Sequence, residues 1–284
     1  YYNYVYFRGI KDTDPDSWEA RVIPHDHAEM RQENSALSYL TPVDYLLWVD
    51  DEARIGALRI FNPQTQTYLR HQENNRHIPP LVELANVLSA TKALEKGTED
   101  LQDLKYLLGN GTSLGGALHK SNVIDLDGIL AIGKFPSQAD QRDIIRGEVL
   151  AMQLAQQAGI NTAPARVETI NKTPVAIISR FDRTATGARI PYLSAASLLE
   201  VSGREDNAYT QVVDAILHVG ANPIADIQEL WRRLVFNFLI CNTDDHLRNT
   251  AFLYNNRRKG WQLSPAFDLN PMLAEKRERN TWLT

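Results

Sequence analysis

A run of polar residues lies between a helix-like stretch and two short strands in the last quarter of the chain. The apolar stretch 226–240 has helical spacing, and Asn242-Thr243-Asp244-Asp245-His246-Leu247-Arg248-Asn249 follows it. Two strand-like runs, 250–254 and 260–263, come next around a basic turn, and Ser264-Pro265-Ala266-Phe267-Asp268-Leu269 comes after them. Because a hairpin turns the chain back on itself, we expect Asp268 to return to the side chains of 242–249. The fold must therefore hold a helix, a polar loop and a hairpin as one unit.

The residue types in this unit suit the transfer of a phosphoryl group. A helix end, an Asp, an Asn five residues later, a hairpin and a second Asp follow the order of the catalytic loop and metal-binding segment of protein kinases. Asp244 would orient the attacking hydroxyl and accept its proton. Asn249 and Asp268 would offer the oxygen ligands that Mg²⁺ prefers. The pattern predicts an ATP- and Mg²⁺-dependent kinase with Asp244 as its catalytic carboxylate.

The chain upstream contains the parts that such an enzyme needs to hold ATP. The glycine-rich stretch 109–117 includes Gly115 and Gly116, whose backbone can approach phosphate closely. An Asp-Gly pair at 127–128 predicts a hairpin whose second strand carries Lys134, within reach of the α- and β-phosphates. The helix predicted over 139–158 carries Glu148, which could pair with Lys134 and support it.

The character of the chain changes near residue 182. The region before it is rich in predicted strands, among them 45–48 and 58–61, whereas 194–240 is mostly helical. We expect an α+β, bilobal, protein-kinase-like fold with an N-terminal β-rich subdomain (1–108), a nucleotide-binding part of the N-lobe (109–182) and an incomplete helical catalytic C-lobe (183–284). At the junction, Ser179, Arg180 and Phe181 would offer backbone groups to the adenine edge, and Asp182 could accept from a ribose hydroxyl.

Composition excludes several other classes of protein. The chain has 284 residues, of which 43% are hydrophobic, so a sizeable core can form. A net charge of −5 argues against a bare nucleic-acid binder. The single cysteine, Cys241, cannot form an internal disulfide, which favours a reducing, cytoplasmic setting. No signal peptide or membrane-spanning run is predicted, and the absence of an initial Met suggests a fragment.

Five segments resemble motifs of the HipA-type kinases. Residues 112–120 are similar to that family's Ser-x-Gly-Gly-Ala-x-x-Lys loop, 178–183 to its Arg-Phe-Asp-Arg segment, and 191–199 to its Ser-Ala-Ala-Ser-Leu-Leu helix start. The segments 242–249 and 264–271 resemble its Asn-x-Asp-Asp-His-x-x-Asn and Ser-Pro-Ala-Tyr-Asp-Leu-Asn-Pro motifs. With a further likeness over 51–61, the resemblance covers most of the chain.

This resemblance implies roles for further residues. The phosphate-binding loop would contain Ser113, Gly115, Gly116, Ala117 and Lys120, and both Lys134 and His246 would contact the ATP phosphates. Ser113 would be the loop serine that such kinases autophosphorylate. A phosphate there carries a charge of about −1.5 to −2 and would repel ATP.

The resemblance also implies a setting and partners. HipA-type proteins are serine/threonine kinases that act as toxins of bacterial type II toxin–antitoxin modules, or related stand-alone proteins. Their substrates are translation components, notably aminoacyl-tRNA synthetases. The usual partner is a small helix-turn-helix antitoxin that binds operator DNA, so we expect contact with DNA only through a partner or a segment outside this sequence.

Two other functions fit parts of the pattern. A pseudokinase would bind a nucleotide and regulate a partner without catalysis, which a labelling assay with [γ-³²P]ATP would reveal. A metal-dependent nuclease or hydrolase could use Asp244, Asp245, His246 and Asp268 to activate water. That second reading leaves Lys134 and the glycine-rich loop without a task.

Overall fold

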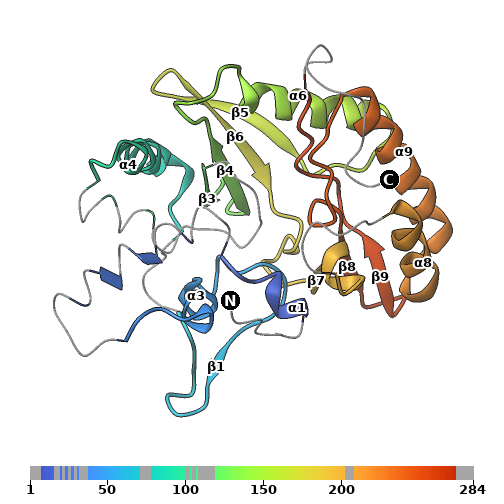
Figure 1. Cartoon of the computed structure of the whole chain (residues 1–284), viewed down its shortest axis with the longest axis horizontal. Helices are drawn as coiled ribbons and strands as arrows, with labels where there is room; N and C mark the ends of the chain where they lie inside the picture. Colours follow the sequence, from blue (N-terminus) through green and yellow to red (C-terminus); the bar gives the residue numbers. More distant parts are fainter. Residues whose placement is uncertain are drawn as a thin grey trace.

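The computed structural model describes residues 8–15, 20, 23–24, 27–28, 31, 38–70, 78–99, 103, 107, 119–201 and 208–272. They form the predicted α+β fold, with a β-rich part and a mostly helical part (Figure 1). The helices are α1 (Arg8–Lys11), α3 (Pro42–Trp48), η1 (Leu81–Glu83), α4 (Leu84–Lys96), α6 (Ile144–Gln157), α7 (Ala195–Leu198), α8 (Tyr209–Val219) and α9 (Pro223–Leu239). The strands are β1 (Phe61–Asn62), β2 (Thr67–Tyr68), β3 (His119–Ile124), β4 (Leu130–Phe135), β5 (Ala165–Ile170), β6 (Thr173–Ser179), β7 (Tyr192–Ser194), β8 (Ala251–Asn255) and β9 (Gly260–Leu263).

The four-stranded sheet has the order β3-β4-β6-β5, and every neighbouring pair is antiparallel. The predicted Asp-Gly hairpin joins β3 to β4, with Gly128 in the left-handed region at φ 79°. Asn171 and Lys172 both have positive φ between β5 and β6, as a two-residue hairpin turn of this kind requires. These turns fix the register that places Lys120 directly opposite Lys134.

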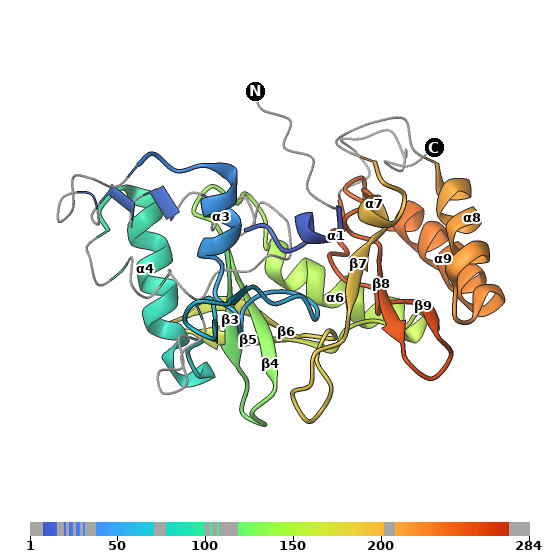
Figure 2. The same cartoon turned by 90° about the horizontal axis from the view of Figure 1, so that it is seen from below.

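Helices cover both faces of this sheet. Val175 and Ile177 belong to the buried cluster around α4, whereas Ala176 and Ile178 belong to the cluster around α6. This alternation along β6 is the two-residue period of a strand buried on both sides. Figure 2 shows α4 and α6 on either side of the strands.

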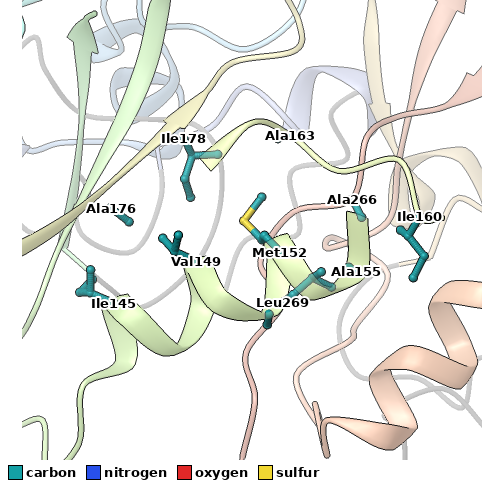
Figure 3. Close-up of a cluster of buried hydrophobic side chains, with 11 residues drawn as sticks. Ile145, Val149, Met152, Ala155, Ile160, Ala163, Ala176, Ile178, Ala266 and Leu269 are labelled. Carbon is teal, nitrogen blue, oxygen red and sulfur yellow. The ribbon is translucent and has the colours of Figure 1, made fainter. Parts of the chain in front are cut away.

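Helix α6 is fixed at both ends. The Asp143 side chain accepts from the Arg146 backbone N–H at 2.9 Å, which caps the first turn. Gly159, predicted as the stop, has φ 79°, and the N–H groups of Gly159 and Ile160 bond back into the last turn. Ile145, Val149 and Met152 face the sheet and Leu269 (Figure 3). The same packing carries Glu148 into the interior, where it is fully buried.

The second part consists of the β7-β8-β9 sheet packed against α7, α8 and α9. Its core includes Val212, Ile216, Leu230 and Phe252. β8 begins two residues after Asn249, so the polar loop is anchored directly to this sheet. In the described part of the chain, no helix is both long enough and apolar enough to cross a bilayer.

The N-terminal region differs from the sequence prediction. Residues 45–48 are helical, not a strand, because Thr41 and Asp44 cap α3 reciprocally. The strand expected over 58–61 is limited to β1, which begins at Phe61. Most of a further helix expected over 100–108 lies outside the described residues.

The packing under α6 predicts a contrast between two of its residues. Met152→Ala should lower the free energy of unfolding by about 2–4 kcal/mol, because Met152 is 1% exposed and its removal leaves a cavity. Leu150→Ala, on the same helix but 55% exposed, should change it by less than about 1 kcal/mol. Urea denaturation of the three proteins measures both values, and equal losses would contradict the described packing.

Candidate functional site

A cavity opens between the four-stranded sheet and the segment that follows β9. Its empty volume is about 440 Å³, counted out to the solvent at its mouth. The lining residues are Lys120, Ile132, Lys134, Ile178, Ser179, Arg180, Phe181, Asp182, Phe267 and Asp268. The sequence analysis predicted a site role for all of them except Ile132, Ile178 and Phe267. The cavity thus brings together residues that are up to 148 positions apart, from Lys120 to Asp268.

Lys134 is the centre of the charged end of this cavity. Its side chain extends from β4 and is buried, and Nζ donates to Glu148 Oε1 at 2.6 Å. The same ammonium donates to Asp268 Oδ1. The pairing of Lys134 with Glu148 that the sequence suggested is therefore present, and Asp268 joins it. One cation links the sheet, helix α6 and the segment after β9.

The two carboxylates around Lys134 differ in their affinity for protons. Burial raises the pKa of Glu148, even though Lys134 opposes the shift. Burial acts on Asp268 too, but Lys134 and Lys120 outweigh it and lower the pKa of Asp268. Burial also lowers the pKa of Lys134, yet Asp268 and Glu148 outweigh it and raise that pKa above its usual value. Asp268 therefore stays ionised, as a ligand for a hard cation must.

Lys120 adds a second cation to the same end of the cavity. It pairs directly with Lys134 across β3 and β4, and both side chains are buried and line the cavity. Like charges placed opposite each other destabilise a sheet. Glu148 and Asp268 carry negative charges that offset this repulsion, and both lysines lie where an anion in the cavity would meet them.

The other end of the cavity is apolar. Ile132 and Ile178 come from the sheet, and Phe181 and Phe267 approach with ring centroids 5.4 Å apart. Ser179 and Arg180 already donate their backbone N–H groups to the carbonyls of Pro164 and Leu130. Of the three residues predicted to meet the adenine edge, Phe181 is thus the one whose N–H is not committed to another described residue.

Asp182 is surrounded by donors from the protein itself. Arg180 donates to both of its oxygens, at 2.9 and 2.6 Å, and Arg183 donates to Oδ2 at 2.5 Å. The backbone N–H of Gly56 donates to Oδ2 at 2.7 Å. Gly56 has φ 72°, and a Cβ there would lie 3.0 Å from that of Tyr192, so only glycine suits this approach. This geometry favours a structural role for Asp182 over the ribose contact that the sequence suggested.

Arg180 connects the same network to the turn at 50–56 and to strand β3. Its Nη1 donates to the Ala53 carbonyl and to Asn122 Oδ1, each at 2.7 Å, and Nη2 donates to the Arg54 carbonyl. Burial alone would raise the pKa of Asp182, but Arg180 and Arg183 outweigh it and lower it to about 2. The arginines thus join the turn at 50–56 to the junction between the two parts of the fold.

The polar loop begins where α9 ends. Cys241 has φ 55°, its N–H bonds to the Phe238 carbonyl at 3.3 Å, and the N–H of Asn242 bonds to the Asn237 carbonyl at 2.9 Å. These are the two hydrogen bonds of a Schellman motif, with a cysteine where glycine is usual. The Asn242 side chain then accepts from the Asp244 backbone N–H at 3.2 Å. The chain is thereby turned sharply out of the helix just before Asp244.

Within the loop, the predicted residues divide by exposure. Asp244 is exposed, with 63% of its side chain accessible, and its Oδ1 lies 3.9 Å from His246 Nε2. Asn249 Nδ2 donates to the Asp244 carbonyl at 2.7 Å, which leaves Oδ1 as the end of the amide available to a ligand. Asp245 is buried and accepts from the Tyr209 hydroxyl at 2.5 Å. This contact gives Asp245 a structural role in holding the loop against α8.

Several buried polar atoms of the site have no hydrogen-bond partner among the described residues. They are Glu148 Oε2, Thr243 Oγ1, His246 Nδ1 and Asn270 Oδ1. Buried polar groups are normally paired, so these atoms could accept or donate hydrogen bonds to a polar ligand or to water. Thr243 and Asn270 were not singled out by sequence reasoning, although each is adjacent to or near an aspartate that was.

Asp268 itself has a strained backbone. Its φ is 53°, in the left-handed region that few residues other than glycine adopt without cost. The described residues include no cluster of three His, Cys, Asp or Glu side chains that could hold a metal by itself. Asp268 lines the cavity and Asn249 does not, although both side chains carry oxygen donors of the kind that Mg²⁺ prefers.

The glycine-rich loop is not part of this geometry. Ser113, Gly115, Gly116 and Ala117 lie outside the described residues, which resume at His119. Of the predicted phosphate-loop residues, Lys120 is the one whose position is known.

A β-rich part with a buried Lys–Glu pair, and a helical part with a polar loop and an Asp after a hairpin, define a kinase-like α+β protein. The family model "HipA-like C-terminal domain" matches residues 112–284. The chain belongs to this family.

Two curated relatives also match this chain. Two proteins of Sinorhizobium fredii match, "Putative kinase Y4mE" at 26% identity over 57% of this chain and 43% of the relative, and "Putative kinase Y4dM" at 28% over 79% and 54%. The chain thus spans about half the length of these relatives.

Two solved structures match with a TM-score of 0.47 each. HipA of Shewanella oneidensis MR-1, in complex with HipB and its operator DNA, is 20% identical over 54% of this chain and 40% of that one. The proinflammatory kinase CtkA of Helicobacter pylori is 23% identical over 58% and 57%.

The network around Asp182 predicts a large loss of stability on neutralisation. Asp182→Asn should lower the free energy of unfolding by about 3 kcal/mol or more at pH 7, because two buried arginines lose their counter-charge. Asp214→Asn, an exposed position on α8, should have little effect.

The difference between wild type and Asp182→Asn should also depend on pH. Since the folded-state pKa of about 2 lies below the ordinary 3.8, the charge of Asp182 stabilises the fold above about pH 4. That contribution should fade as the pH falls from about 4 toward 2. Urea denaturation at several pH values measures it, and a difference that grows in acid would contradict the assignment.

Proposed function

We propose that this protein is a kinase that transfers the γ-phosphoryl group of ATP to a serine or threonine hydroxyl of a protein. The observation that carries the proposal is the buried Lys134, held between Glu148 and Asp268 at the charged end of a cavity with Lys120 opposite. Two buried lysines at one end of a cavity would together bind the oxygens of a polyphosphate.

ATP would lie in this cavity with its phosphates toward the lysines. Lys120 and Lys134 would bind phosphate oxygens at the charged end. The adenine ring would lie among Ile132, Ile178, Phe181 and Phe267, whose side chains form the apolar walls. An apolar slot with a few charged groups at one end is the usual form of a nucleotide pocket.

Asn249 and Asp268 would hold Mg²⁺ at the phosphates. When bound, the ion would supply positive charge against the phosphate oxygens during transfer. Asn249 keeps its amide oxygen pointed away from the Asp244 carbonyl through its own Nδ2 hydrogen bond. Lys134, paired with Asp268 in this structure, would then contact phosphate while Glu148 keeps it in place.

Asp244 would act on the attacking hydroxyl. The substrate oxygen forms a bond to the γ-phosphorus as the bond from that phosphorus to the β–γ bridging oxygen breaks, and ADP leaves. Asp244 accepts the hydroxyl proton, and its high exposure lets a protein substrate reach it. His246, close to Asp244, would contact the phosphate being transferred.

The glycine-rich loop would close over the phosphates and regulate the enzyme. Gly115, Gly116 and Ala117 would supply backbone N–H groups, and Ser113 would be autophosphorylated. A phosphorylated Ser113 would compete with ATP for the two lysines, since its charge repels the nucleotide.

Family membership supports a further proposal about setting. The protein would act as a toxin kinase or a related paralogue, its substrate would be a translation component such as an aminoacyl-tRNA synthetase, and a helix-turn-helix antitoxin would be its partner. Contact with DNA would then be made by the antitoxin.

Removal of the catalytic carboxylate should separate transfer from binding. Asp244→Ala should reduce incorporation of ³²P from [γ-³²P]ATP into self and lysate proteins by about 10²-fold or more, because proton acceptance is lost. Its affinity for a fluorescent ATP analogue should stay within a few-fold of wild type, since Asp244 lies outside the cavity lining.

A lysine of the cavity and an exposed lysine test the nucleotide site. Lys134→Ala should weaken both nucleotide binding and turnover, whereas Lys172→Ala, an exposed lysine in the β5–β6 turn, should change neither. Full transfer by Asp244→Ala, or tight ATP binding by the wild type with no labelling at all, would refute the proposed activity.

Ser113 should be the main site of self-labelling. Ser113→Ala should remove most ³²P from the protein while transfer to other substrates continues, because the loop serine is a target and not a catalytic group. Mass spectrometry of the peptide that contains Ser113 checks this result. A labelled Ser113 peptide in Asp244→Ala would instead point to another kinase.

A further inference from the structure

The short segment after α1 is joined to the part of the fold that carries the polar loop. The Ser194 backbone N–H donates to Asp12 Oδ2 at 2.8 Å, and the Ser194 hydroxyl donates to Asp12 Oδ1 at 2.6 Å. The Ser194 oxygen also accepts from the Ser197 N–H at 3.1 Å, as the N-cap of α7. Figures 1 and 2 both show α1 beside β7. Both oxygens of Asp12 are therefore used to fix the residue that begins α7.

The first turn of α7 in turn holds the polar loop. The N–H of Ala195 donates to the Thr250 carbonyl at 2.8 Å, and that of Ala196 donates to the Leu247 carbonyl at 3.2 Å. These two carbonyls lie on either side of Asn249. Hydrogen bonds thus run without a break from Asp12, through Ser194 and α7, to the backbone that carries the proposed metal ligand.

The position of α7 in this path depends on Asp12. α7 has four residues, and a single helical turn has little stability of its own. The direction of its N–H groups therefore depends on what holds Ser194, namely the hydrogen bonds to Asp12 and the pairing of Ser194 with Ala251 between β7 and β8. Asp12 is itself fixed, because the buried Arg54 donates to the carbonyl and hydroxyl of the adjacent Thr13 at 3.3 and 3.4 Å. The N-terminal region is thereby coupled to the loop.

We propose that Asp12 is a positioning residue, which sets the place of Asn249 through the first turn of α7. It touches neither nucleotide nor protein substrate. The inference rests on the proposed kinase function for its catalytic consequence, but the coupling itself is a property of the fold. Loss of Asp12 should lower the affinity for Mg²⁺ and slow phosphoryl transfer, while the cavity that would bind the adenine and phosphates stays intact.

The test uses Asp12→Asn, whose single side-chain oxygen can accept only one of the two hydrogen bonds from Ser194, beside Asp12→Ala. The rate of phosphoryl transfer is measured against Mg²⁺ concentration. We expect about a tenfold lower kcat and a Mg²⁺ requirement raised several-fold, since small displacements of a catalytic group are costly. Affinity for a fluorescent ATP analogue without Mg²⁺ should be unchanged. An Asp12→Asn protein with wild-type kcat and Mg²⁺ dependence would overturn the proposal.

Asp14→Asn is the matched control. Asp14 is an acidic residue two positions away that feels the charge of Arg248, as Asp12 does, but the described hydrogen bonds of Ser194 do not involve it. We expect near wild-type Mg²⁺ dependence. If Asp14→Asn matches Asp12→Asn, the effect is one of charge on Arg248, and the positioning role is wrong.

Hydrogen exchange separates this inference from the kinase proposal. In Asp12→Asn, the backbone N–H groups of 194–197, followed by peptide mass spectrometry, should exchange faster than in wild type, whether or not the protein has kinase activity. Unchanged exchange in a folded variant would refute the coupling. Absence of activity in the wild type with faster exchange in the variant would refute only the proposed function.

Discussion

The ion cluster of Lys134, Glu148 and Asp268 is the contact on which the site depends. Buried charges lose their hydration, and that loss is offset only where opposite charges meet in good geometry. Here the geometry is imposed by apolar packing. Val149 and Met152 fix the helix that carries Glu148, and the packing of Leu269 in the same cluster fixes the chain next to Asp268. Asp268 has its left-handed φ next to this packed Leu269.

A second charged network orients the N-terminal region. Arg180 and Asp182 tie the turn at 50–56 to the sheet and to the junction at 180–191, and they do so by hydrogen bonds to backbone carbonyls and N–H groups. Such contacts are directional, whereas apolar contacts tolerate sliding. The two networks meet at the cavity, because Arg180 and Asp182 line it together with Lys134 and Asp268.

The sequence was most informative where a structure depends on neighbouring residues. The Asp-Gly hairpin before Lys134 and the glycine at the end of α6 follow local rules and were predicted. The capping box from Thr41 to Asp44 is equally local, but the β-rich composition of 45–48 hid it. The partners of Asp182 could not have been predicted, because Gly56 lies 126 residues away and no periodic pattern links the two.

The polar loop shows why a few exposed side chains need so many buried contacts. Asp244 is exposed and His246 is half-buried, and the loop is held by the end of α9, by Tyr209 through Asp245, and by the N–H groups of α7. A loop fixed on three sides pays the entropy of ordering when the protein folds and not when a substrate arrives. Because one of the three supports begins at Asp12, the proposed binding of a metal by the loop would depend on a region that lies outside the cavity lining.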